Sequence, residues 1–185
     1  MLHDLFLKNR SYRRFTDMRI SDAELRSFVE SARISASAAN RQRLRFALVS
    51  DPCETVQVFD TLRFAAFLKD WGGPRECERP TAYIVLMCRG ELDTNLAIDA
   101  GIAAEAILLT ATEQGYGGCM FRSYDSDRLS AILNREGYTP ALVIALGKPA
   151  ETVRIVEPKD GDLKYYRDEN DDHLVPKLSL DDLVI

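Results

Sequence analysis

The sequence predicts an α+β fold in which strands and helices follow one another irregularly around one core. Apolar runs typical of buried strands alternate with amphipathic segments of varied length, and only one pair of segments resembles a strand–helix–strand unit. The chain has 185 residues, enough for one well-buried core and too few for two comfortable domains. We therefore expect a single domain, residues 1–185, built as an α+β sandwich rather than a doubly wound α/β sheet.

The first third of the chain carries a strong helix signal. Ser21-Asp22-Ala23-Glu24 is a capping box, and apolar residues follow it at helical spacing, which predicts a helix from Asp22 to Ile34. The stretch from Ser35 to Gln42 is too polar for a strand and too weakly periodic for a helix. A short buried strand is predicted from Phe46 to Val49, and an amphipathic helix from Thr55 to Lys69.

The middle of the chain supplies the central elements. The continuous apolar run from Ala82 to Met87 predicts a strand in the centre of the sheet. The segment from Asn95 to Gln114 predicts a long helix that is apolar nearly all round. Such a helix is expected to be buried on every side, as a core helix or against a partner subunit. Gly115 follows it as a glycine cap.

The last third is less regular. Strands are predicted at Cys119–Phe121 and Ala141–Leu146, with a helix capped by Ser126 and running to Leu133 between them. The stretch from Pro158 to Asp172 is acidic and poorly patterned. The tail that follows contains enough leucine and valine to dock on another surface.

Charge and composition exclude several classes of function. The net charge is −5, although residues 1–50 carry ten Lys or Arg against five Asp or Glu. An acidic protein of this kind is a poor nucleic-acid binder, but a local basic pocket suits a small anion. The longest apolar tract, Leu96 to Ala111, contains Asp99 and Glu105, which argues against a membrane span. No early segment has the order of a signal peptide, so we expect a cytoplasmic protein.

A metal site is not predicted. The four cysteines are widely spread without metal-ligand spacing, and the chain has only two histidines. Reduced thiols in a cytosolic protein are the simplest interpretation.

Arg10, Ser11, Arg13 and Arg14 form the most distinctive cluster, just after a hydrophobic start. Guanidinium groups make paired, charge-assisted hydrogen bonds to phosphate oxygens, so this cluster is a candidate anion site. The alternative is a solvated basic turn after a short helix.

Three segments in register resemble motifs of the FMN-dependent nitroreductase family: Arg10-Ser11-Tyr12-Arg13-Arg14-Phe15, Ser37-Ala38-Ala39-Asn40-Arg41-Gln42, and Gly115-Tyr116-Gly117-Gly118-Cys119-Met120. The similarity runs from about Leu5 to Lys177. It implies a central, mostly antiparallel sheet flanked by helices, and an intertwined homodimer with two FMN sites at the interface. It also implies that residues 157–185 are a C-terminal extension that docks on the partner subunit.

The resemblance also implies which residues bind the cofactor. By position, Arg10, Ser11, Tyr12 and Arg13 correspond to ligands of the FMN phosphate and ribityl chain, and Ser37, Ala38, Ala39, Asn40 and Gln42 to the loop along the ribityl chain and pyrimidine edge. Met120, Phe121, Arg122 and Ser123 fall where the family lays backbone against the flavin, and Lys177 at a late basic position near the phosphate. The alternatives are a surface cluster, a polar turn, a core strand and a surface lysine, respectively.

Three departures from the family pattern concern the site. Asn9 stands where the family often has arginine, Arg43-Leu44 replaces a Pro-Trp pair, and Arg122 replaces a frequently acidic residue. The first affects the geometry around the phosphate. The other two affect the substrate pocket.

The implied activity needs no catalytic side chain, because the flavin carries the redox chemistry. NADH or NADPH would deliver hydride to FMN, and a small electron-poor acceptor, a nitroaromatic or a quinone, would then take the same place in a ping-pong cycle. A positive group near the pyrimidine edge would stabilise the reduced flavin, and Arg41, Arg43 and Arg45 are the candidates. The alternatives are an FMN-binding protein that stores or senses flavin with little turnover, and a dimeric interaction protein without flavin.

Overall fold

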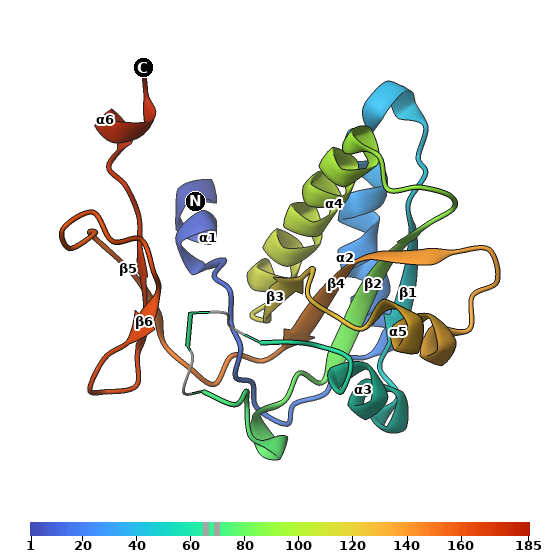
Figure 1. Ribbon diagram of the computed structural model, residues 1–185, viewed down its shortest axis with the longest axis horizontal. Helices are drawn as coiled ribbons and strands as arrows, with labels where there is room; N and C mark the ends of the chain where they lie inside the picture. The colour runs from blue at the N-terminus through green and yellow to red at the C-terminus, as the bar shows by residue number, and fades with distance from the viewer. Residues whose placement is uncertain (65–66, 69–70) are drawn as a thin grey trace.

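The computed structural model describes residues 1–64, 67–68 and 71–185 and has a four-stranded sheet at its centre (Figure 1). The strand order is β1-β2-β4-β3, and every neighbouring pair is antiparallel. The strands are β1 (Arg45–Val49), β2 (Ala82–Cys88), β3 (Gly117–Phe121) and β4 (Thr139–Gly147). All seven residues of β2 are buried, as its unbroken apolar run predicted. The α+β class and the antiparallel central sheet are thus confirmed.

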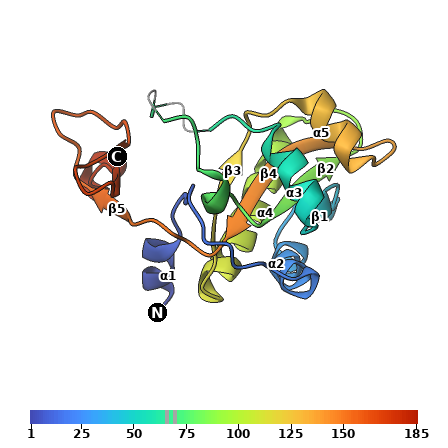
Figure 2. The same ribbon diagram turned by 90° about the horizontal axis from the view of Figure 1, so that it is seen from below.

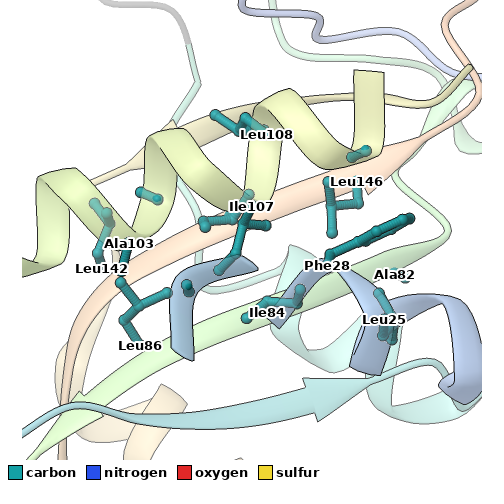
Figure 3. Packing of buried hydrophobic residues seen from close by; sticks show 14 of the residues in the cluster. Leu25, Phe28, Ala82, Ile84, Leu86, Ala103, Ile107, Leu108, Leu142 and Leu146 are labelled. Carbon is teal, nitrogen blue, oxygen red and sulfur yellow. The ribbon is translucent and has the colours of Figure 1, made fainter. Parts of the chain in front are cut away.

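Helices cover both faces of this sheet (Figure 2). On one face lie α2 (Asp22–Ile34) and α4 (Thr94–Glu113), and on the other α3 (Pro52–Phe59) and α5 (Ser126–Leu133). Alternate residues of each strand serve the two faces. On the α2–α4 side, Phe28 and Ile107 pack with Ile84 in the largest of the three apolar clusters found among the described residues (Figure 3).

Helix starts follow side-chain capping. The Ser21 hydroxyl accepts the Glu24 N–H at 3.3 Å, and Glu24 accepts the Ser21 N–H at 2.8 Å, so the predicted helix Asp22–Ile34 is confirmed. For α5 the cap is Asp125 rather than the expected Ser126, because the Asp125 carboxylate accepts the Arg128 N–H at 3.1 Å.

The helix predicted over Thr55–Lys69 is wrong in its extent. Asp51 caps α3 with Pro52 at the first turn, and the helix ends at Phe59. The chain then follows tertiary contacts instead of helical periodicity: Leu62 bridges to Tyr124, and the Phe64 ring packs edge-on against Phe121 at 4.7 Å between centroids. The rest of the predicted helix includes residues 65–66 and 69, which lie outside the described residues.

Within a single chain the long helix α4 is buried on one face only, so the core-helix alternative is wrong, whereas burial against a partner subunit stays a prediction. Its inner residues pack against α2 and the sheet, whereas Ile98 is 55% exposed and Ile102 39% exposed. By length and composition alone α4 is long and apolar enough to cross a membrane, but its inner face belongs to the core of this fold. The outer face is an apolar surface without cover in a single chain.

A second, three-stranded sheet was not predicted. Parallel pairing joins β5 (Val153–Val156) to β7 (His173–Pro176), and antiparallel pairing joins β7 to β6 (Tyr166–Arg167). These strands and α6 (Leu180–Leu183) form the C-terminal lobe, residues 153–185. In both views the lobe stands away from the main sheet, near α1 (Leu2–Lys8) (Figures 1 and 2). The leucines of the predicted docking tail, Leu178, Leu180 and Leu183, are exposed.

Candidate functional site

A cavity of about 350 Å³ lies between the N-terminal arginine motif and the C-terminal lobe. We call it the motif cavity. Its lining residues come from five parts of the chain: Asn9, Arg10, Ser11, Arg13, Glu105, Leu108, Cys119, Met120, Tyr165, His173, Val175 and Lys177. The structure therefore brings together five of the predicted cofactor ligands, namely Arg10, Ser11, Arg13, Met120 and Lys177.

The motif is held along the open edge of β3. Ser11 forms a parallel bridge with Gly118, and the Tyr12 N–H donates to the Gly118 carbonyl at 3.0 Å. The close packing of Tyr12 on β3 requires glycine at position 117, because an added Cβ would lie 2.5 Å from the Tyr12 ring. Tyr12 itself packs against β3, donates its hydroxyl to the Lys8 carbonyl at 3.0 Å, and is not among the residues that line the cavity.

A buried carboxylate supports the arginine motif from behind. The Glu151 side chain is only 2% exposed, and its carboxylate accepts the backbone N–H groups of Arg13 and Arg14 and pairs with Arg167 of β6. Arg14 pairs with Asp171 and does not line the cavity. The motif and the C-terminal lobe are thus joined by ionic contacts, one buried and one partly exposed, through residues that do not line the cavity.

The chemistry of the motif cavity suits an anion. Arg10, Arg13 and Lys177 supply positive charge, while the carboxylate among its lining residues, Glu105, is engaged by the Asn9 amide at 2.9 Å. Two buried nitrogens, Arg10 Nε and His173 Nε2, have no hydrogen-bond partner among the described residues. Buried polar atoms are usually satisfied, so these two donors fit a missing polar ligand such as a phosphate group.

Burial and the neighbouring Arg13 charge lower the pKa of His173 to about 4. His173 is therefore neutral near pH 7. It contributes hydrogen-bonding capacity rather than charge to the cavity.

The edge of β3 also offers main-chain donors. The Gly118 carbonyl points to the open edge, where it accepts the Tyr12 N–H. In an antiparallel strand the N–H and C=O of one residue point to the same edge, and those of the next residue point to the opposite edge. Met120, two residues on, therefore directs its N–H to the same edge. Met120 as a whole is 37% exposed, and it lines the cavity.

A second cavity, of about 280 Å³, continues from the motif cavity past the end of β3. The two share Arg13, Cys119, Met120 and Tyr165. The remaining lining residues of this strand-end cavity are Arg63, Phe64, Phe121, Arg122 and Ser123. Arg122 uses Nη1 to bond the Ala141 carbonyl at 3.0 Å, so part of its guanidinium is directed to β4.

The loop Ser37–Gln42 does not line the motif cavity. It rests on α4 through the buried Asp99, whose carboxylate accepts the Ala38 N–H at 2.8 Å. Ala39, Asn40 and Gln42 all have positive φ, which an irregular polar loop accommodates at some cost. Ser37 and Gln42 line a different cavity of about 490 Å³, the loop cleft, together with Arg26, Arg33, Arg43 and Arg45. Within one chain, this loop and the motif cavity are separate.

The arginines expected near the pyrimidine edge belong to the loop region. Arg43 pairs with Asp93, and Arg45 donates to the carbonyls of Gln42 and Leu44 at 2.8 and 2.7 Å. Arg63 instead lies at the strand-end cavity, beside Met120. It was assigned to a helix in the sequence analysis, and nothing in the local pattern distinguishes it from a surface arginine.

Tyr165 and His173 are the other site residues that the sequence analysis missed. Tyr165 belongs to the acidic, poorly patterned stretch from Pro158 to Asp172 and His173 directly follows it, and neither periodicity nor a motif marks them. The short aromatic and basic run Tyr165-Tyr166-Arg167 is the one available signal.

Comparison with known families gives a match over most of the chain. The model described as "Nitroreductase family" matches residues 7–76 and 89–148. These ranges include the arginine motif, the Ser37–Gln42 loop, α4 and β3.

Solved structures with the same fold support this match. A nitroreductase family protein from Streptococcus pneumoniae TIGR4 is 18% identical, with a TM-score of 0.72 over 100% of this chain and 99% of that one. An FMN-dependent nitroreductase from Clostridium difficile R20291 is 22% identical, with a TM-score of 0.66 over 90% and 98% of the two chains. A BluB-like flavoprotein from Clostridium difficile 630 is 19% identical, with a TM-score of 0.68 over 86% and 94%. At these identities the likeness concerns the fold.

Proposed function

This chain belongs to the nitroreductase family, and on that premise we propose that it is an FMN-dependent oxidoreductase. It takes hydride from NADH or NADPH and passes electrons to a small electron-poor acceptor such as a nitroaromatic or a quinone. The observation that carries the proposal is the motif cavity, which is lined by Arg10, Arg13 and Lys177 and by His173. Two buried nitrogens of these side chains, Arg10 Nε and His173 Nε2, have no partner within the part of the chain that the structure describes.

The residues present fit FMN. Arg10, Ser11, Arg13 and Lys177 would hold the phosphate, since guanidinium and ammonium groups form charge-assisted hydrogen bonds to its oxygens. The Met120 N–H at the open edge of β3 would donate to the flavin ring. Bound FMN supplies the hydride transfer.

The chain's own residues supply orientation and electrostatics. Arg63 and Arg122 line the strand-end cavity next to Met120, and a fixed positive charge there favours the negatively charged reduced cofactor. In this proposal Arg63 and Arg122 take the role expected of Arg41, Arg43 and Arg45, because Arg63 and Arg122 line the strand-end cavity and the other three do not.

The direct test is anaerobic reduction. FMN-loaded protein mixed with NADH or NADPH should lose its yellow colour, and adding an electron-poor acceptor should restore it. Bound flavin that remains oxidised with both nucleotides would contradict the oxidoreductase and favour a protein that stores or senses flavin.

We also propose that the protein works as a homodimer, in which residues 157–185 dock on the partner. Three features support this assembly. The outer face of α4 exposes Ile98 and Ile102, α1 exposes Leu2, Phe6 and Leu7, and the tail exposes Leu180 and Leu183. Exposed apolar side chains gathered on neighbouring elements are typical of an interface.

Charge complementarity favours binding of the tail in the partner's loop cleft. The tail carries Asp181 and Asp182, whereas the partner's loop cleft has an apolar floor and four arginines, which outnumber its two carboxylates, Glu30 and Asp99. The tail begins directly after Lys177 of the motif cavity. A tail that enters the partner's loop cleft would therefore bring the partner's Ser37–Gln42 loop next to the motif cavity and join the two separated halves of the flavin site.

Deleting residues 178–185 tests this assembly. The 185-residue protein should have the mass of two 20.9 kDa chains under native conditions. The shortened protein should already dissociate into monomers at higher protein concentrations, and it should bind FMN more weakly. A full-length protein that is monomeric at micromolar concentration would contradict the dimer while leaving the FMN proposal to its own test.

A further inference from the structure

The guanidinium of Arg13 is held on several sides. Its Nη1 donates to the Ser11 carbonyl at 3.1 Å and lies 3.4 Å from His173 Nδ1. Its central carbon lies 4.8 Å from the centroid of the Tyr165 ring. The backbone N–H of the same residue is bound by the Glu151 carboxylate. Arg13 is thus restrained at both its backbone and its side chain.

The contact with His173 defines the state of the imidazole. A guanidinium has only donors, so Nδ1 must be the acceptor and the proton must lie on Nε2. His173 is fully buried, and its ring packs edge-on against Tyr165 with 5.2 Å between centroids. The imidazole therefore directs Arg13 without adding a second positive charge.

Both side chains that hold the Arg13 guanidinium from outside the motif come from the C-terminal lobe. Tyr165 directly precedes β6, and His173 begins β7. Both line the motif cavity with Ser11 and Lys177. The lobe thus fixes the position of an arginine that lies more than 150 residues earlier in the chain, as the separation of 160 residues between Arg13 and His173 shows.

We propose that Tyr165 and His173 are positioning residues that orient the Arg13 guanidinium toward the ligand's phosphate and thereby make the site select FMN over riboflavin. The inference rests on the proposed function. A flexible arginine loses side-chain entropy when it binds, and a restrained one loses less. Stacking on the Tyr165 face leaves the guanidinium edge free to donate. Because riboflavin has no phosphate, only FMN gains from this orientation.

The test compares the affinities of ligand-free protein for FMN and riboflavin. In His173→Leu and Tyr165→Leu the affinity for FMN should fall about tenfold or more, the size expected for weakening a charge-assisted contact. The affinity for riboflavin should change by less than about twofold, because riboflavin has no phosphate to form the charge-assisted contact with Arg13. His173→Asn, whose amide oxygen replaces the Nδ1 acceptor, should recover most of the FMN affinity.

The other histidine provides a matched control. His3→Leu, in α1, should leave both affinities unchanged. If His173→Leu does not fold, Tyr165→Leu still tests the inference, because Tyr165 is only half-buried. An FMN-to-riboflavin ratio that stays at the wild-type value in Tyr165→Leu would overturn the inference. Wild-type protein that binds neither flavin would instead overturn the proposed function.

Discussion

The motif cavity and the loop cleft both gather arginines, but the two regions hold them differently. Behind the motif cavity, the paired side chains of Glu151 and Arg167 are 2% and 11% exposed. At the loop cleft, Arg33 pairs with Glu30 although the two side chains are 64% and 56% exposed. Behind the motif cavity an arginine pairs with a buried carboxylate, whereas at the loop cleft the arginine pair is open to solvent and the buried Asp99 holds the backbone of Ala38.

This difference in burial indicates that the motif cavity is preorganised for an anion, whereas the loop cleft is incomplete in a single chain. Charges fixed by buried partners meet an anion with little reorganisation, which favours tight binding. Exposed arginines above an apolar floor gain little until a second surface excludes water from them. The motif cavity is therefore expected to bind its ligand within one chain, and the loop cleft to become functional on assembly.

The largest expected effect comes from removing the fixed charges. The variant Arg10→Ala/Arg13→Ala should lose on the order of 3–6 kcal/mol of FMN binding free energy, because two charge-assisted contacts to phosphate disappear. Calorimetric titration of ligand-free protein with FMN measures this loss.

Two exposed arginines serve as the control for that variant. Arg128→Ala/Arg135→Ala removes the same charge from α5 and from the turn just after it, where neither residue lines the motif cavity, and should leave FMN binding unchanged. Equal affinities for both double variants would show that the motif does not bind the phosphate.

The next effect concerns the brace itself. Glu151→Gln removes the charge that pairs with Arg167 and weakens the acceptor of two backbone N–H groups. Breaking a buried ion pair from one side typically costs about 3–5 kcal/mol of unfolding free energy. Urea denaturation should show this loss, whereas Glu30→Gln at the exposed pair should leave the midpoint unchanged. Similar midpoints for the two variants would contradict the contrast between the regions.

A smaller effect follows from acidification. The pKa of His173 is lowered to about 4, chiefly by burial and then by Arg13, with Arg167 acting in the same direction and Glu151 in the opposite one. As the pH falls from 6.5 toward 4, the unfolded state takes up the proton first, so stability declines in this window by on the order of 2–3 kcal/mol. The unfolding free energies of the wild type and of His173→Asn are measured at each pH. As the pH falls, the value for the wild type should approach that for His173→Asn. Parallel curves for the two proteins would contradict the buried, neutral histidine.

The smallest effect is expected in the loop. Ala39 has φ of 50° and ψ of 27°, a left-handed conformation that glycine adopts without steric cost. Ala39→Gly should raise the unfolding free energy by less than about 1 kcal/mol, because the relieved strain is partly offset by the greater freedom of glycine in the unfolded chain. Thermal unfolding measures the change, and a clear destabilisation would show that the loop is not strained.

Much of the central fold could be predicted because its patterns are local. The capping box at Ser21 and the apolar run at Ala82 identified a helix and the central strand, since each is a short-range physical signal. The helix expected beyond Phe59 failed where aromatic contacts between Phe64 and Phe121 override periodicity. The second sheet was missed because its strands are two to four residues long and only half-buried.

The site was predictable only in part. Arg10, Ser11 and Arg13 are adjacent in sequence, so their convergence needed no tertiary information. His173 and Tyr165 join them through a fold that returns about 150 residues later, which no local pattern encodes. The outer face of α4 looked like core from composition alone, although a single chain leaves it exposed. Composition indicated that this face must be covered, without indicating by what.

Titration of ligand-free protein with FMN, followed by the visible absorbance of the flavin, tests the central claim most directly. We predict saturable binding of one FMN per chain that is lost in Arg10→Ala/Arg13→Ala and retained in Arg128→Ala/Arg135→Ala. A wild-type protein that stays colourless after excess FMN is removed would contradict the assignment of the motif cavity as a flavin phosphate site.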